Sequence, residues 1–82
     1  MKNYFYGVYW VELDGEAVLC EVDGGTCYEA YRSKARAEKS AKRSTEAFSA
    51  HGAQYVARRI PAGVLIWDDV THRKVITDAI PE

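Results

Sequence analysis

The fold of this chain is decided by residues 4–31, which read YFYGVYWVELDGEAVLCEVDGGTCYEAY. Residues 4–13 have the β-branched and aromatic composition of a strand, and residues 16–22 predict the strand that returns beside it. Between them, Asp14-Gly15 predicts a two-residue turn whose twist matches that of a hairpin. A second turn at residues 23–25 leads to a third predicted strand over residues 26–31.

The first turn predicts which side chains face the core. A two-residue loop places Val11 opposite Val18 and Tyr9 opposite Cys20. Because side chains alternate across a strand, one face is then almost wholly apolar, and we expect it to form the core. This predicted core face holds Phe5, Tyr9, Val11, Leu13, Val18, Cys20 and Val22.

The second turn permits two registers. A two-residue loop at Asp23-Gly24 would pair Cys20 with Cys27 and invite a disulfide, but it would also turn Glu29 towards the core. A three-residue loop instead gives the core Thr26, Tyr28 and Ala30. Burying an unpaired carboxylate is costly, so we expect the three-residue loop and two unbonded cysteines.

The opposite face of the predicted sheet is also apolar along its first strand, where Tyr4, Tyr6, Val8 and Trp10 lie. An antiparallel sheet with one solvated face should alternate between apolar and polar residues. One interpretation is that a C-terminal strand or loop covers this face. The other is an exposed aromatic patch with an acidic margin, which is typical of a protein-binding surface. The predicted partner-binding residues are Tyr4, Tyr6, Trp10, Glu21, Asp23, Glu29 and Tyr31.

The rest of the chain predicts one helix followed by strands. Ser33 is a suitable N-cap, and residues 34–51 are rich in helix formers up to Gly52, a typical C-terminal stop. The helix should pack on the core face through a stripe of Ala37, Ala41, Ser44 or Thr45, and Phe48. Strands are predicted at residues 54–60, 64–67 and 74–77. The expected fold is one α+β domain over residues 1–82, an antiparallel sheet of about five strands with the helix on one face.

The composition favours a small intracellular protein without cofactors. No apolar run is long enough to cross a bilayer, and no signal-peptide pattern is present, so we expect no membrane association. Two cysteines without a framework spacing indicate a reducing compartment, and we expect a cytoplasmic location.

Residues that could support catalysis or metal binding are sparse. His51 and His72 lack metal-ligand spacing to a cysteine or carboxylate, and Asp68-Asp69 is typical of an acidic turn. Nothing indicates an activated thiol at Cys27. We therefore expect a non-enzymatic protein with no metal and no cofactor.

Charge is strongly segregated along the sequence. Residues 1–31 hold one lysine and six acids, whereas residues 32–59 hold eight basic residues and two acids. A basic helical face is the usual means of contacting nucleic-acid phosphates, which gives an alternative function, DNA or RNA binding. Its predicted residues are Arg32, Lys34, Arg36, Lys39, Lys42 and Arg43.

Two resemblances follow from this organisation. The order of sheet then basic helix, with the junction Tyr31-Arg32-Ser33-Lys34, is similar in outline to the arm-type DNA-binding domains of integrases, which implies a nucleic-acid partner. The short, aromatic-rich chain with segregated charge also resembles small inhibitors encoded by phages and mobile elements, such as anti-CRISPR proteins.

The second resemblance implies an α+β inhibitor that occupies the surface of a host defence complex in the host cytoplasm. Some such inhibitors mimic nucleic acid with acidic residues, and here an acidic rim would surround the aromatic anchors. A second copy of the chain could cover the aromatic face instead, so a homodimer is an open alternative. The acidic rim comprises Glu12, Asp14, Glu16, Glu21, Asp23 and Glu29.

Overall fold

A computed structural model describes residues 2–12, 14–48, 52 and 54–81, with only the backbone described at residues 22 and 23. Within these residues it has one α-helix and seven short strands. In chain order they are β1 (Tyr6–Val11), β2 (Ala17–Leu19), β3 (Glu21–Val22), a 3-10 turn (Asp23–Gly25), β4 (Cys27–Tyr31), α1 (Lys34–Ala47), β5 (Gln54–Arg59), β6 (Leu65–Asp68) and β7 (Arg73–Ile76).

Strand β1 is the centre of the sheet. One of its edges pairs with β5 along its whole length, and its other edge is divided between β2 and β4. Strands β2 and β3 are two parts of one bent strand, because Cys20 between them donates its N–H to Val8 of β1 and accepts from Glu29 of β4. At Cys20 the bent strand thus changes from pairing with β1 to pairing with β4.

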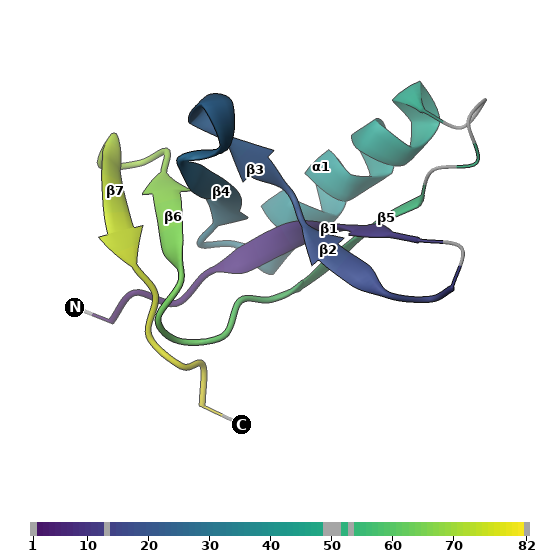
Figure 1. Cartoon of the computed structure of the whole chain (residues 1–82). Helices are drawn as coiled ribbons and strands as arrows, with labels where there is room; N and C mark the ends of the chain where they lie inside the picture. Colours follow the sequence, from purple (N-terminus) through teal and green to yellow (C-terminus); the bar gives the residue numbers. More distant parts are fainter. Residues whose placement is uncertain (1, 13, 49–51, 53, 82) are drawn as a thin grey trace.

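The sheet is completed by two strands from the end of the chain. Strand β6 pairs in parallel with β4, and β7 pairs antiparallel with β6, at the opposite end of the molecule from the β1–β2 hairpin (Figure 1). All other pairings are antiparallel. The predicted α+β class is confirmed, but the sheet is mixed, since the parallel β4–β6 pair was not expected.

The main hydrophobic core lies on the face of β1 that points away from the helix. Phe5, Ala30, Ile60 and Ile66 are buried there, and Leu19, Tyr28, Val64 and Val75 pack around them. The side chains of this core pack so closely on Gly7 that a Cβ there would lie 2.6 Å from Leu19 Cδ1 and 2.9 Å from Ile60 Cδ1. Glycine at this position therefore lets the two sides of the core meet.

Helix α1 covers the other face, which corrects the predicted arrangement. Tyr6 of β1 pairs with Tyr31 of β4, whose hydroxyl reaches Ser40 of the helix at 3.4 Å. Val8, next on this face, is only 1% exposed. The face expected to be spare is thus the floor beneath the helix, and the C-terminal strands close the core on the opposite side (Figure 1).

The helix begins as predicted and ends early. Ser33 is its N-cap, and its Oγ accepts from the N–H of Arg36. Ala37 and Ala41 are buried, as expected for a thin helix lying close to a sheet. The last helical residue is Ala47, and Phe48, predicted to face the core, is largely exposed. His51, the predicted end, lies outside the described residues.

The register of the first hairpin differs by one residue from the prediction. Trp10 pairs with Val18 and Tyr9 with Leu19, and Glu12 donates to the carbonyl of Glu16. Three residues separate that pair, and Gly15 lies in the left-handed region at the end of the loop (φ 88°). The slip turns Val18 outward and Leu19 towards the core, which reverses the predicted assignment. Leu13 lies outside the described residues.

The second turn is longer than either predicted loop. Val22 pairs with Cys27 and Glu21 with Tyr28, so four residues separate the strands. Tyr28 and Ala30 contribute to the core as predicted, whereas Thr26 is exposed. Cys27 is buried, although the prediction placed it on the more exposed face. Both cysteines are free, as expected.

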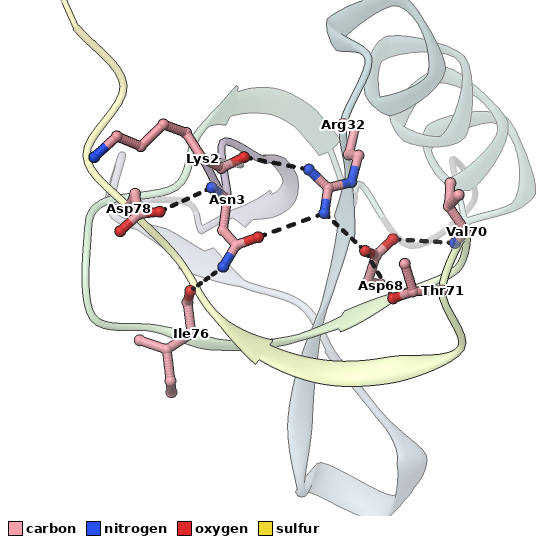
Figure 2. A network of polar contacts seen from close by, with 8 residues as sticks. All are labelled: Lys2, Asn3, Arg32, Asp68, Val70, Thr71, Ile76 and Asp78. Atoms are coloured by element: carbon pink, nitrogen blue, oxygen red, sulfur yellow. Dashed lines mark hydrogen bonds and ion pairs between the residues drawn. The ribbon is translucent and has the colours of Figure 1, made fainter.

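The three later strands lie within one residue of their predicted positions, and the tail beyond them is held in place. Thr77 donates its hydroxyl to the Pro61 carbonyl at 2.6 Å and accepts from the Val64 N–H at 3.0 Å. Asn3 and Asp78 exchange two hydrogen bonds of 2.8 Å (Figure 2 draws the one to the Asp78 carboxylate). The two ends of the described chain thus meet beside β7.

Candidate functional site

The predicted partner-binding residues do not form one surface. Trp10 is exposed, whereas Tyr4, Tyr6 and Tyr31 are half-buried, the last two beside the helix. Glu21 is exposed on β3, and the side chain of Asp23 lies outside the described part of the structure. Only Trp10 among the predicted aromatic anchors projects freely, so the candidate surface is built around it.

Three strands and the helix end bring apolar side chains to Trp10. Val18 of β2 and Tyr55 of β5 are its register partners, so all three lie on one face. The ring of Tyr55 in turn contacts that of Phe48 at 6.1 Å between centroids. Trp10 and Val18 are each 44% exposed and Phe48 is 48% exposed. We call this row the Trp10 patch: Val18, Trp10, Tyr55 and Phe48.

The C-terminal end of helix α1 is attached to strand β5 beside this patch by the side chain of Thr45. The Thr45 hydroxyl accepts the N–H of Tyr55 at 2.9 Å and donates to the Tyr55 carbonyl at 3.3 Å. These bonds satisfy backbone groups at the free edge of β5 and set the distance from the helix to the strand. Phe48, three residues further along the helix, is thereby held against the Tyr55 ring.

An acidic cluster adjoins the Trp10 patch. Glu12 and Glu16 pair across the hairpin two positions beyond Trp10 and Val18, and therefore on the same face. With Asp14 they place three carboxylates within 4.8 Å of one another. These residues belong to the predicted acidic rim, and the structure gathers them at one side of the exposed rings.

Glu29, another predicted rim residue, is half-buried beside the helix instead. Its carboxylate accepts from the Ser40 hydroxyl at 3.4 Å, and Ser40 accepts from Tyr31. Burial raises the pKa of Glu29 above its ordinary value, although the hydrogen bonds from Ser40 and Tyr31 oppose that rise. A shallow pocket of about 170 Å³ lies beside it, lined by Glu29, Ala30, Tyr31, Trp67 and Asp69.

Comparisons with known proteins leave function to be argued from this geometry. No protein-family model, no curated protein and no solved structure matches the chain. Among the described residues, moreover, no helix combines the length and the apolar character that crossing a bilayer requires.

Two of the predicted nucleic-acid contacts are engaged within the protein. Arg32 binds Asp68 at 2.9 Å and reaches the Lys2 carbonyl and the Asn3 side chain (Figure 2). Its guanidinium group also lies over the Phe5 ring, 4.5 Å from the ring centroid. Arg36 binds Asp69 and lies over the Tyr31 ring. These guanidinium groups hold the helix and strand β6 together, and the expected basic face is correspondingly reduced.

The remaining basic residues of the helix are exposed. Lys34 lies 3.9 Å from Glu38, and Lys39, Lys42 and Arg43 point to solvent. Lys34 also lines a notch of about 380 Å³ with residues from the far end of β1 and from β5, namely Tyr6, Ala57, Arg58 and Arg59. The predicted basic face comprised residues 32–43 and did not include the two arginines of β5.

The cysteines lack the surroundings of a nucleophile. Burial, joined by repulsion from the Glu29 carboxylate, raises the pKa of the Cys20 thiol against the effect of a hydrogen bond from the Trp10 backbone. Cys27 is buried. A reactive thiol needs a lowered pKa and access to solvent, and neither side chain combines them.

Sequence reasoning missed three of the four residues of the Trp10 patch. Val18 was assigned to the wrong face because the hairpin register was off by one residue. Phe48 was placed in the core because it continues the helical stripe of Ala37 and Ala41. The signal for Tyr55 was its place in an alternating strand, but its partner on β1 could not be known before β5 was placed at the sheet edge.

Proposed function

We propose that this chain is a non-enzymatic protein-binding module that docks through the Trp10 patch. The observation that carries the proposal is the continuous row of large apolar side chains across β2, β1, β5 and the end of α1, most of it exposed. Protein interfaces take most of their binding energy from a few aromatic anchors that become fully desolvated. Trp10 lies at the middle of the row and is the expected anchor.

The acidic cluster specifies the chemistry of the partner. Carboxylates of Glu12, Asp14 and Glu16 stand beside the apolar row and favour a target with an apolar depression and a basic margin. Rim charges of this kind act chiefly on the association rate and on selectivity. Binding should therefore weaken with salt through slower association, while Trp10 controls dissociation.

A basic surface is the electrostatic footprint of proteins that bind nucleic acid, and this links the proposal to inhibition. The resemblance in organisation to small phage-encoded inhibitors of the anti-CRISPR kind suggests the same class of target. In this proposal the module occupies the nucleic-acid-binding surface of a host defence complex. The expected biochemical consequence is competition between the module and the nucleic acid for one surface.

The test is affinity capture from host-cell extract, followed by direct titration against each captured protein. Trp10→Ala and Phe48→Ala should each weaken binding by about 2 kcal/mol or more, roughly thirtyfold, while circular dichroism shows that the fold is retained. Reversing the acids, as in Glu12→Lys with Glu16→Lys, should slow association with little change in dissociation.

Matched controls come from exposed apolar residues elsewhere. Val70 and Ile76 are at least as exposed as Trp10 but lie outside the patch, so Val70→Ala and Ile76→Ala should leave binding unchanged. Equal capture by Trp10→Ala and wild-type protein would refute the proposal. A dimer in light scattering that Trp10→Ala converts to monomer would assign the patch to a second copy of the chain instead.

A further inference from the structure

The notch between the start of α1 and strand β5 is lined mostly by cationic and aromatic residues. Tyr6, Lys34, Ala57, Arg58 and Arg59 surround a volume of about 380 Å³. This falls within the range of about 300–1,000 Å³ that is usual for small-molecule sites. The notch is thus large enough for more than a simple ion.

The topology explains why these residues meet. Tyr6 and Arg59 are register partners on the helix-facing side, whereas Arg58 is the register partner of Gly7, so its side chain faces the opposite side of β5. Lys34 is the first residue of α1, whose first turn contains no acidic residue. Among the described strands, β5 pairs only with β1, so its outer edge leaves the notch accessible.

The positive charge of the notch is poorly compensated. Within the described residues, Arg58 and Arg59 take part in no salt bridge. Lys34 has one acidic neighbour, Glu38, at 3.9 Å, and both of these side chains are exposed. By contrast, Arg32 and Arg36 are each bound to an aspartate. Lys34 and Arg59, which both line this space on the helix side, repel each other, and an anion placed between them would relieve that repulsion.

We propose that this notch binds the phosphate group of a nucleotide, with the base lying against the Tyr6 ring. Arginine offers paired donors that match phosphate oxygens, and lysine adds a point charge. Aromatic rings are the common platform for bases of single-stranded nucleic acids. The same chemistry serves a free nucleotide or one unit of a single strand.

The notch is separate from the Trp10 patch. Tyr6 and Trp10 lie four residues apart on one face of β1, which corresponds to about 13 Å. Nucleotide binding is thus independent of the proposed protein contact, and each activity can be lost without the other.

The test is titration of the uniformly nitrogen-15-labelled protein, followed by amide NMR, with adenosine monophosphate, adenosine and inorganic phosphate as probes. Adenosine monophosphate should bind more tightly than either other probe and should shift the amides of Tyr6, Lys34 and Arg58. Arg59→Glu and Lys34→Glu should each weaken binding by about ten- to a hundredfold, as the loss of a charge-assisted hydrogen bond predicts.

Two further variants test whether binding depends on the notch itself or only on the overall positive charge of the helix. Lys39→Glu makes the same charge change on the helix outside the notch and should leave affinity nearly unchanged. Glu38→Gln removes the acidic neighbour of Lys34 and should tighten binding. Arg59→Gln, a milder change at an exposed position, carries the test if a charge-reversal variant fails to fold.

A short thymidine oligonucleotide then identifies the source of the phosphate. Tighter binding than thymidine monophosphate assigns the notch to single-stranded nucleic acid, and equal binding assigns it to free nucleotides. The proposal is overturned if adenosine monophosphate and inorganic phosphate bind equally weakly, or if Lys39→Glu lowers affinity as much as Lys34→Glu. It is also overturned if no amide around the notch shifts.

Discussion

Asp68 shows how one buried charge can organise several loops. Its side chain is fully buried, and its two oxygens accept from the Val70 N–H, the Thr71 hydroxyl and Arg32, each at 2.9 to 3.0 Å (Figure 2). Arg32 continues the network to the backbone of Lys2 and to Asn3. One carboxylate thereby connects the turn after β6, the junction between β4 and α1, and the N-terminal segment.

Asp68 should make the protein sensitive to acid. Burial alone would raise its pKa, but the hydrogen bonds from Val70, Arg32 and Thr71 and the Arg32 charge outweigh burial and hold the pKa below its ordinary value. The unfolded state therefore binds the proton more readily, so stability is present above the unfolded pKa of about 3.9 and is lost as pH falls through the lower folded value.

The measurement is the urea midpoint of wild type and Asp68→Asn between about pH 3 and pH 7. We expect the variant to be less stable near neutrality by about 3 kcal/mol, because Arg32 loses its partner. Below about pH 4 the difference should shrink. A constant difference over the whole range would mean that the Asp68 charge plays no part.

Glu29 should have the opposite pH dependence. Its pKa is raised, first by burial, so the folded state holds the proton more tightly than the unfolded state. Stability from this group is therefore complete below the unfolded pKa of about 4.3 and declines as pH rises through the folded value. Glu29→Gln should be more stable than wild type near neutral pH. Thermal melts at several pH values should show that gain disappear in acid, and a variant that is less stable at every pH would contradict this.

At the scale of the elements, the hairpins show how far local patterns can predict a fold. The positions of the later strands, the Ser33 cap and the α+β class follow from periodicity and turn residues. The registers do not, because Asp14-Gly15 suits both a two-residue turn and a longer loop that ends with glycine in the left-handed region. Gly15 adopts the second role, and one residue of slip exchanges Val18 and Leu19 between the faces.

The side of the sheet that binds the helix was also beyond local patterns. Both faces of β1 are apolar, so the alternation of side chains could not show whether the Tyr9 face or the Val8 face packs against the helix. The choice is made by distant residues, since Ile60 and Ile66 reach the Gly7 face from after the helix. A prediction limited to residues 4–31 contains no information on which face of β1 the helix covers and which face these later residues cover.

The close packing on Gly7 should depend on the absence of a side chain there. In Gly7→Ala the new methyl group would lie within 3 Å of Leu19 and the buried Ile60, and fitting it should cost about 1–3 kcal/mol. Chemical denaturation measures this loss. Adding Ile60→Val should recover part of it, because the second change removes an atom from the same space. Additive losses in the double variant would show that the two positions do not compete for room.

At the scale of the molecule, the candidate surface was predictable only in part. Trp10 was identified because it breaks the alternation expected of a half-solvated sheet, and the acidic hairpin because its charges are adjacent in sequence. The remaining members of the Trp10 patch come from β2, β5 and the helix end, and they meet only through the tertiary fold. The same holds for the notch, where Lys34 and Arg58 come from separate elements.

The meeting of the chain ends has a consequence for how the protein folds. Asn3 and Asp78 are 75 positions apart in the sequence, and the parallel partner of β4 is made only after the whole helix. Helix α1 can begin to form from neighbouring residues, but the core around Phe5 must wait until β6 and β7 arrive. Closing such large loops is slow, because the chain loses conformational entropy before stabilising contacts form. Refolding on the order of milliseconds to seconds therefore follows from this topology. During synthesis, the first hairpin must remain without its core until the last strands have left the ribosome.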